Sequence, residues 1–185
     1  MDDMKLEVTG QKNTKLVSVI VTAVLIGIGA ALRSFAPPIF TITPNLVIAM
    51  YCLAIILVRP KMSGALVIGI VGGVVSMLTS KSPNPYLNLI TEPAGALACY
   101  LIVTTLPNLS IFKYMLKPIL ATFIGTLASG SLYVILNAVF FAMPTPVAIG
   151  AFVSVVLPTA TINTVIAYVL YLPSQKVLNL EPQNV

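Results

Sequence analysis

Charged residues are scarce in this sequence. Aspartate, glutamate, lysine and arginine together make up 8% of its 185 residues, whereas about 25% is usual for a globular domain. Hydrophobic residues account for 58%, and the mean hydropathy is +1.02. A water-soluble fold of this length would need more polar residues to cover its surface. The composition therefore predicts an integral membrane protein that forms a single membrane domain over residues 1–185.

Histidine is absent, which removes the commonest acid–base residue and metal ligand. Cys52 and Cys99 stand alone in apolar stretches, without a Cys-x-x-Cys pairing. No Gly-Lys dipeptide occurs, so the phosphate-binding loop Gly-x-x-x-x-Gly-Lys-Ser/Thr cannot be formed. We therefore expect no metal site and no cofactor in this chain, and a protein that is not an enzyme.

Acidic residues number only five, and four of them lie in the terminal segments. Glu92 alone lies near an apolar segment. A carrier that couples transport to protons usually has carboxylates inside the membrane. The sequence therefore gives little support to a transporter that supplies its own energy.

Apolar segments separated by prolines and polar residues fill most of the chain. They cover residues 16–32, 45–58, 64–79, 93–106, 118–142 and 147–172. A helix needs about 20 apolar residues to cross a bilayer, so the second, third and fourth segments are short. We predict an all-α integral membrane protein of six transmembrane helices, with a polar N-terminal tail at residues 1–15 and a C-terminal tail at residues 173–185.

Basic residues are distributed unevenly between the two sides that six helices would create. Eight of the ten fall on the side of both termini: Lys5, Lys12, Lys15, Arg59, Lys61, Lys113, Lys117 and Lys176. Arg33 and Lys81 fall on the other side. Cytoplasmic loops collect lysine and arginine, so we predict that both termini are cytoplasmic. Membrane topology thus accounts for the basic excess without a nucleic-acid partner.

Polar residues on the predicted outer side could bind a small molecule. Arg33 ends the first segment, Asn45 opens the second, and a loop containing Tyr86 and Asn88 leads into Glu92. Arg33 and Glu92 are the one pair of opposite charges expected near the membrane there. Simpler interpretations are that Arg33 extends to the membrane surface, that Glu92 begins a helix at Pro93, or that the two charges pair with each other.

An amino acid would use both charges. Arginine can bind a carboxylate through two parallel hydrogen bonds, and Glu92 could accept the ammonium group. Hydrogen bonds could come from Asn45, Asn88 and Asn163, and contacts to an aromatic ligand from Tyr86, Tyr133, Phe140 or Phe141.

Small residues recur at every fourth position of the first apolar segment, at Ala23, Gly27 and Ala31. Such a stripe lets two helices approach closely in lipid. It could pack against the protein's own helices or bind a partner subunit.

Four segments, in order along the chain, resemble a known family. The first is residues 23–40, with Ala-Ala-Leu-Arg-Ser-Phe-Ala-Pro-Pro, and the others are residues 66–73, 88–93 and 155–164. They are similar to parts of the tryptophan-specific S components of energy-coupling factor (ECF) transporters. The resemblance extends over about residues 21–178, nearly the whole chain.

The resemblance implies a six-helix protein of a bacterial plasma membrane that captures tryptophan or a related small aromatic compound from outside. It also implies association with a transmembrane coupling subunit and two cytoplasmic ATPase subunits, which use the ATP. Ala23, Gly27 and Ala31 would then form the docking surface. The residues by themselves leave open a stand-alone secondary carrier for a small amino acid-like solute, and a membrane partner protein that transports nothing.

Overall fold

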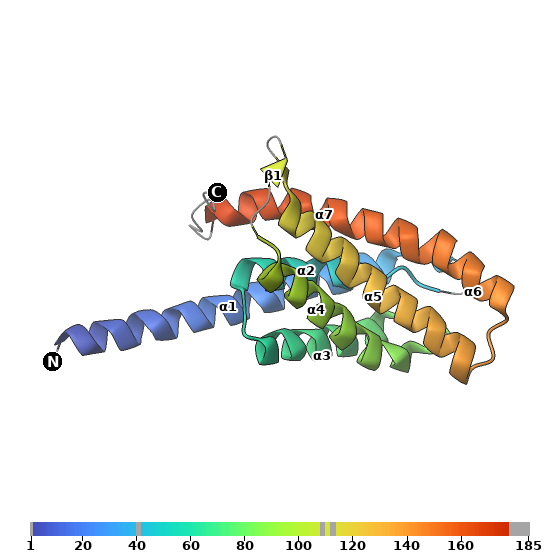
Figure 1. Ribbon diagram of the computed structural model, residues 1–185. Helices are drawn as coiled ribbons and strands as arrows, with labels where there is room; N and C mark the ends of the chain where they lie inside the picture. The colour runs from blue at the N-terminus through green and yellow to red at the C-terminus, as the bar shows by residue number, and fades with distance from the viewer. Residues whose placement is uncertain (1, 40–41, 108–109, 112–113, 178–185) are drawn as a thin grey trace.

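The computed structural model describes residues 2–39, 42–107, 110–111 and 114–177, and the side chains of residues 15–39, 42–107 and 115–175. Nearly all of these residues are helical. The helices are α1 (Asp2–Phe35), α2 (Val47–Val58), α3 (Met62–Thr79), η1 (Pro85–Leu87), α4 (Asn88–Thr105), α5 (Leu116–Phe140), α6 (Thr145–Ala151), η2 (Phe152–Val156) and α7 (Leu157–Val177) (Figure 1). A pair of two-residue strands, β1 (Ser110–Ile111) and β2 (Tyr114–Met115), precedes α5.

Five helical segments are long and apolar enough to cross a membrane. They are Lys15–Phe35, Met62–Thr79, Pro85–Thr105, Leu116–Phe140 and Thr145–Gln175. The last combines α6, η2 and α7 into one continuous segment. The prediction of an apolar helical membrane protein is therefore confirmed.

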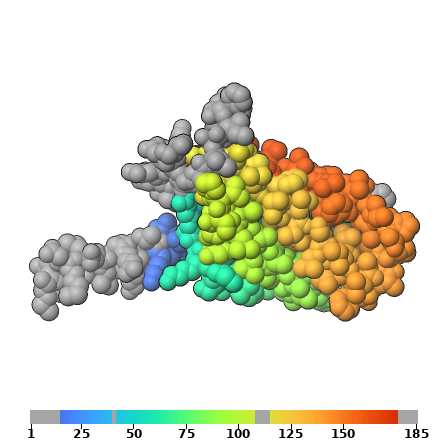
Figure 2. Space-filling model, in the orientation of Figure 1, coloured from blue at the N-terminus to red at the C-terminus, as the bar shows by residue number. Residues whose placement is uncertain are grey.

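The sixth apolar helix, α2, is short and lies at the centre of the bundle. Its 12 residues give a length of about 18 Å, less than the roughly 30 Å of a hydrocarbon core. Residues 47–57 are all buried, and α2 contacts α1, α3, α4, α5 and α7. An all-round apolar helix is one that other helices surround. In Figure 2 the surface turned to the viewer is formed largely by α3, α4, α5 and α7.

The membrane part of α1 packs through one narrow stripe. Its buried residues are Leu25, Ile26, Gly29 and Arg33, at the spacing of a single helix face. A Cβ atom added at Gly29 would lie 2.9 Å from the Cα atom of Val47. Glycine therefore allows α1 to approach the start of α2.

A second close approach joins α4 to α5. A Cβ atom added at Gly95 would lie 2.6 Å from the hydroxyl oxygen of Tyr51 and 2.9 Å from the carbonyl oxygen of Gly125. The two backbones therefore meet beside Tyr51, which α2 supplies. Small residues are what close helix contacts in membranes require.

The helix before α7 contains a wide turn. The Leu157 N–H donates to the carbonyl oxygen of Phe152, five residues back, which defines the π-helical segment η2. Pro158 follows at once; it lacks an N–H, and its ring would collide with the carbonyl group four residues earlier in a regular helix. The widened turn accommodates that proline without ending the helix.

The helices run alternately between two ends of the bundle. α1 begins and α7 ends toward the same end, on the left in Figure 1, and α6 lies at the opposite end. α1 ends, α2 begins and α4 begins at this opposite end, where the cavity described below lies.

Candidate functional site

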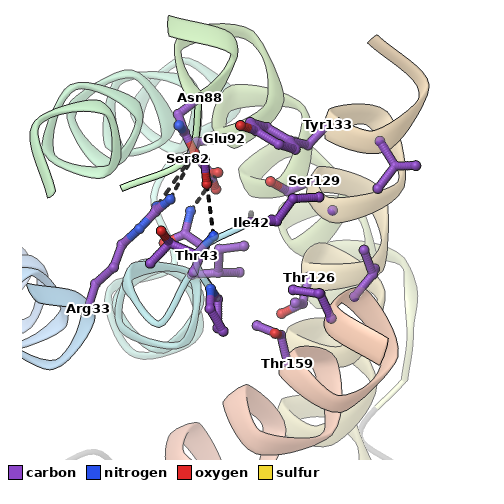
Figure 3. Close-up of a pocket in the computed structure, with 17 residues that line it drawn as sticks. Arg33, Ile42, Thr43, Ser82, Asn88, Glu92, Thr126, Ser129, Tyr133 and Thr159 are labelled. Atoms are coloured by element: carbon purple, nitrogen blue, oxygen red, sulfur yellow. Dashed lines mark hydrogen bonds between the residues drawn. The ribbon is translucent and has the colours of Figure 1, made fainter. Parts of the chain in front are cut away.

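A cavity lies inside the bundle where α1 ends and α2 and α4 begin (Figure 3). Its volume is about 40 Å³, well below the roughly 300–1,000 Å³ of small-molecule sites, so it would have to widen to admit a ligand. Polar and apolar residues both line it. The polar ones include Arg33, Thr43, Asn45, Ser82, Asn88, Glu92, Thr126, Ser129, Tyr133 and Thr159. The apolar ones include Ile42, Ile48, Val134, Val155 and Val156.

Glu92 lines this cavity and is 1% exposed. Its Oε1 accepts a hydrogen bond from Asn45 Nδ2 at 2.7 Å, and its Oε2 accepts one from the Tyr51 hydroxyl at 2.9 Å. α4 begins at Asn88, and Pro93 lies within it. The expectation that Glu92 precedes a helix start at Pro93 is therefore wrong: the carboxylate is one turn inside the helix and points into the protein.

Arg33 projects into the same cavity from the last turn of α1 and is also 1% exposed. Its Nη1 and Nη2 donate to Asn88 Oδ1 at 3.5 and 3.4 Å, which are long hydrogen bonds. Its Nε has no partner. The side chain thus does not extend to the membrane surface, and its hydrogen-bonding capacity is largely unused.

The two buried charges do not form an ion pair with each other in the described part of the chain. Arg33 contacts Asn88, whereas Glu92 is held by Asn45 and Tyr51. The two charges are close enough to attract each other, but burying two charges without a direct ion pair is costly. A cavity that holds a cation with unused donors beside an anion is suited to a ligand carrying both charges.

Asn45 joins four helices beside the cavity. Its Oδ1 accepts the N–H of Val47 at 3.1 Å, which caps α2, and its Nδ2 reaches Ser76 Oγ of α3 at 3.1 Å besides Glu92. Its carbonyl oxygen accepts a hydrogen bond from Asn163 Nδ2 of α7 at 2.9 Å. Asn163 is buried but does not line the cavity, and its Oδ1 has no partner. It therefore positions Asn45.

Two loops meet over the cavity. The Thr43 N–H donates to Ser82 Oγ at 2.8 Å, and the Lys81 N–H donates to Thr43 Oγ1 at 3.0 Å. Lys81 Nζ also donates to the carbonyl oxygen of Ser34 at 2.9 Å, at the C-terminal end of α1, where a cation is favoured. These bonds hold the two loops and the end of α1 together.

Aromatic residues proposed from the sequence lie in different places. Tyr133 lines the cavity, and its hydroxyl donates to the carbonyl oxygen of Asn84 at 3.2 Å. Tyr86 is 68% exposed and lies outside the cavity, and Phe140 and Phe141 are exposed as well. Of the residues expected to bind substrate, the structure thus gathers Arg33, Asn45, Asn88, Glu92 and Tyr133 around one cavity.

Sequence reasoning missed Thr126 and Ser129, which line the cavity, and Tyr51, which holds Glu92. Thr126 and Ser129 lie on the same face of α5 as Tyr133, at spacings of three and four, a polar face that could have been recognised. Tyr51 gave no such signal, because it stands among apolar residues of a wholly buried helix.

The small-residue stripe of α1 faces away from the bundle. Ala23, Gly27 and Ala31 are all exposed, and a Cβ atom added at Gly27 would meet nothing within 4 Å. Gly29, two residues further on, packs against α2 instead.

Long apolar helices that bury charged side chains around an internal cavity are typical of a membrane transport protein. Comparison with known proteins agrees. The profile of the family described as "Tryptophan transporter TrpP" matches residues 13–179. The chain therefore belongs to this tryptophan transporter family, as the sequence motifs predicted. It is a multi-pass protein of a bacterial plasma membrane.

Curated relatives carry the same description. The chain is 31% identical over 169 residues to a "Probable tryptophan transport protein" of Bacillus subtilis (strain 168), an alignment that covers 89% of this chain and 94% of the relative. It is 30% identical over 171 residues to a protein so named from Clostridium perfringens, covering 87% and 91%. A third, from Clostridium acetobutylicum, is 24% identical over 163 residues, covering 87% and 93%. No solved structure matches the chain significantly.

Proposed function

We propose that this chain is the substrate-binding S component of an ECF-type importer. It captures tryptophan or a related small aromatic compound from outside, performs no chemistry on it, and delivers it with a coupling subunit and two ATPase subunits that use ATP. The observation that carries the proposal is the cavity shared by Arg33 and Glu92, two buried charges that do not pair with each other.

A free amino acid matches this arrangement in charge. Its carboxylate would replace Asn88 as the partner of Arg33 and occupy the unused Nε. Its ammonium group would approach Glu92, which keeps Asn45 and Tyr51 as partners. Because the ligand and the charge pair are each neutral overall, binding would add no net charge to the membrane interior.

The aromatic side chain of the ligand would lie against Tyr133 and the apolar residues that line the cavity. Tyr133 supplies a ring for stacking, and Val134, Val155 and Val156 supply apolar contacts. The cavity volume of about 40 Å³ is enough for only a few water molecules, each of which needs about 10–15 Å³. Binding of tryptophan would therefore require the cavity to widen, and the long Arg33–Asn88 bonds are the weakest contacts to give way.

Partner docking rests on the exposed stripe of α1. Ala23, Gly27 and Ala31 present an outward face without bulky side chains, and such a face allows a second helix to approach closely in lipid. The coupling subunit is the partner we propose for it. ATP is then hydrolysed by the partner subunits.

We further propose six crossings with both termini in the cytoplasm. The alternating direction of the helices, with α1 beginning and α7 ending at one end, supports an even number of crossings. Arg59, Lys61 and Lys117 belong to that end; Lys113 and the tail 178–185 lie outside the described residues, as do the side chains of Lys5, Lys12 and Lys176. Cysteine labelling in intact cells tests the topology: Gln11→Cys should resist a membrane-impermeant reagent, and labelling from outside would contradict it.

Calorimetric titration of the purified chain with tryptophan tests the ligand. We expect saturable binding of tryptophan, weaker binding of tryptamine, which lacks the carboxylate, and weaker binding of indole-3-propionate, which lacks the amine. Equal affinity for all three would contradict recognition by Arg33 and Glu92. Co-purification with the coupling and ATPase subunits tests the importer role, and transport by the chain alone in vesicles would favour a secondary carrier.

A further inference from the structure

A second hollow lies at the other end of the bundle from the Arg33–Glu92 cavity. It has a volume of about 330 Å³ and lies between the ends of α2 and α4 and the start of α5. Arg59, Lys117, Tyr100 and Thr104 supply polar groups to its wall. The 12 residues of α2 separate it from Asn45 by about 18 Å, so the two sites are independent.

Arg59 occupies an unusual backbone position at this hollow. It follows the last residue of α2, its N–H donates to the carbonyl oxygen of Ile55 at 3.0 Å, and its φ is 48°. The left-handed conformation costs a residue other than glycine about 1–2 kcal/mol. Glycine or asparagine would end the helix at lower cost, so the backbone alone does not account for an arginine here.

Lys117 adds a second positive charge to the same wall. It lies in the first turn of α5, where the helix dipole disfavours a cation. It is also close enough to Arg59 for the two charges to repel each other. Lys117 is therefore in an unfavourable electrostatic setting, which an anion between it and Arg59 would relieve.

No carboxylate of the described residues compensates these charges. Glu92 is the one acidic residue whose side chain is described, and it is held by Asn45 and Tyr51 in the other cavity. Within the same described residues, neither Arg59 nor Lys117 forms an ion pair. The hollow therefore presents two cations to whatever occupies it.

We propose that this hollow binds the phosphate group of an anionic lipid. Arg59 can offer two parallel donors to phosphate oxygens, Lys117 a point charge, and Tyr100 a hydroxyl donor. Ile55, Pro60 and Val103 line the remainder and suit the glycerol and first methylene groups of a lipid. The position between ends of membrane helices, on the side rich in basic residues, is where basic pockets meet lipid headgroups.

The simpler interpretation is that Arg59 and Lys117 serve only as positive-inside anchors. In that case every basic residue of this end should behave alike. Lys61 provides the matched control, because it lies two residues from Arg59 and is exposed as Arg59 is, but does not line the hollow.

The experiment measures binding of phosphatidylglycerol and phosphatidylcholine to the full purified chain by native mass spectrometry, with thermal unfolding as a second readout. We expect the wild type to retain phosphatidylglycerol preferentially. Arg59→Gln and Lys117→Gln should each weaken its retention at least about tenfold, a difference of about 1.4 kcal/mol, whereas Lys61→Gln should retain it. Arg59→Lys keeps the charge but loses the planar guanidinium group, so its retention of phosphatidylglycerol should lie between those of the wild type and Arg59→Gln. It replaces Arg59→Gln in the test if that variant does not fold.

Tryptophan titration of the same variants separates this proposal from the proposed function. Neither Arg59 nor Lys117 lines the Arg33–Glu92 cavity, so their variants should bind tryptophan as the wild type does. Equal retention of both lipids by the wild type would overturn the proposal, and so would an equal loss in Lys61→Gln. Protection of the wild type by millimolar inorganic phosphate but not by phosphatidylglycerol would overturn the lipid assignment. Loss of coupling-subunit assembly in Arg59→Gln without any change in lipid retention would overturn it in favour of an acidic protein partner.

Discussion

α1 and α2 are both apolar, yet they occupy opposite environments. Residues 47–57 of α2 are buried on every side, whereas α1 buries only one stripe, which ends in Arg33, and turns Ala23, Gly27 and Ala31 outward. In lipid an outward face can be as apolar as an inward one. Hydropathy therefore does not distinguish them. Under the proposed function, this difference assigns ligand binding to the inner stripe and partner docking to the outer one.

The largest effect is expected where the inner stripe ends. Arg33→Lys and Glu92→Gln should each weaken tryptophan binding at least about tenfold, or about 1.4 kcal/mol, because truncating one member of a desolvated charge interaction costs roughly 2–5 kcal/mol. Calorimetry on folded variants measures this. Tyr86→Ala is the control, since Tyr86 lies outside the cavity. Tryptophan affinities close to that of the wild type in both charge variants would contradict the proposal that the cavity binds an amino acid.

Gly29 and Gly27 test the two faces of α1 directly. Gly29→Ala should destabilise the protein by roughly 1–3 kcal/mol, the usual cost of overpacking, because the new methyl group meets the backbone of α2 at Val47. Gly27→Ala has open space and should leave stability unchanged. Thermal unfolding in detergent compares the two. If both variants unfold alike, α1 does not pack as described.

Gly27→Leu should have the smallest effect on the isolated chain and a selective effect on the complex. An outward leucine obstructs close approach of a partner helix, so co-purification with the coupling subunit should fall. Stability should change by less than about 0.5 kcal/mol, as for most surface substitutions, and tryptophan affinity should be unaltered. Normal assembly would show that the partner does not use this stripe.

Most helices could be predicted from the sequence because long apolar runs are what a bilayer demands. The start of α4 could not. Asn88, Thr91 and Glu92 are polar but buried, so they interrupt the apolar run and resemble a loop. The prediction that the helix begins at Pro93 failed because these polar residues face a cavity inside the protein rather than water.

The candidate site was predictable to the extent that charge is rare. Arg33 and Glu92 are conspicuous in so apolar a chain, and the structure brings them to one cavity. Tyr51, which holds Glu92, was not predictable, since a tyrosine among apolar residues usually only fills space. Nor could the sequence tell Gly27 from Gly29, because the rotation of a helix about its own axis is set by its neighbours.

The wide turn η2 makes the number of residues in this part of the chain matter more than their identity. An α-helix rotates by about 100° per residue, and the π turn holds one residue more than a regular turn. Val155 and Val156 belong to this turn and line the cavity, while Asn163 beyond it reaches Asn45. Deleting one residue within Phe152–Val156 would either rotate the residues before the deletion by about 100° against those after it, or close the wide turn to a regular one. A regular turn would bring the ring of Pro158 against the carbonyl group four residues earlier. The segment should therefore accept substitutions far more readily than a change of length.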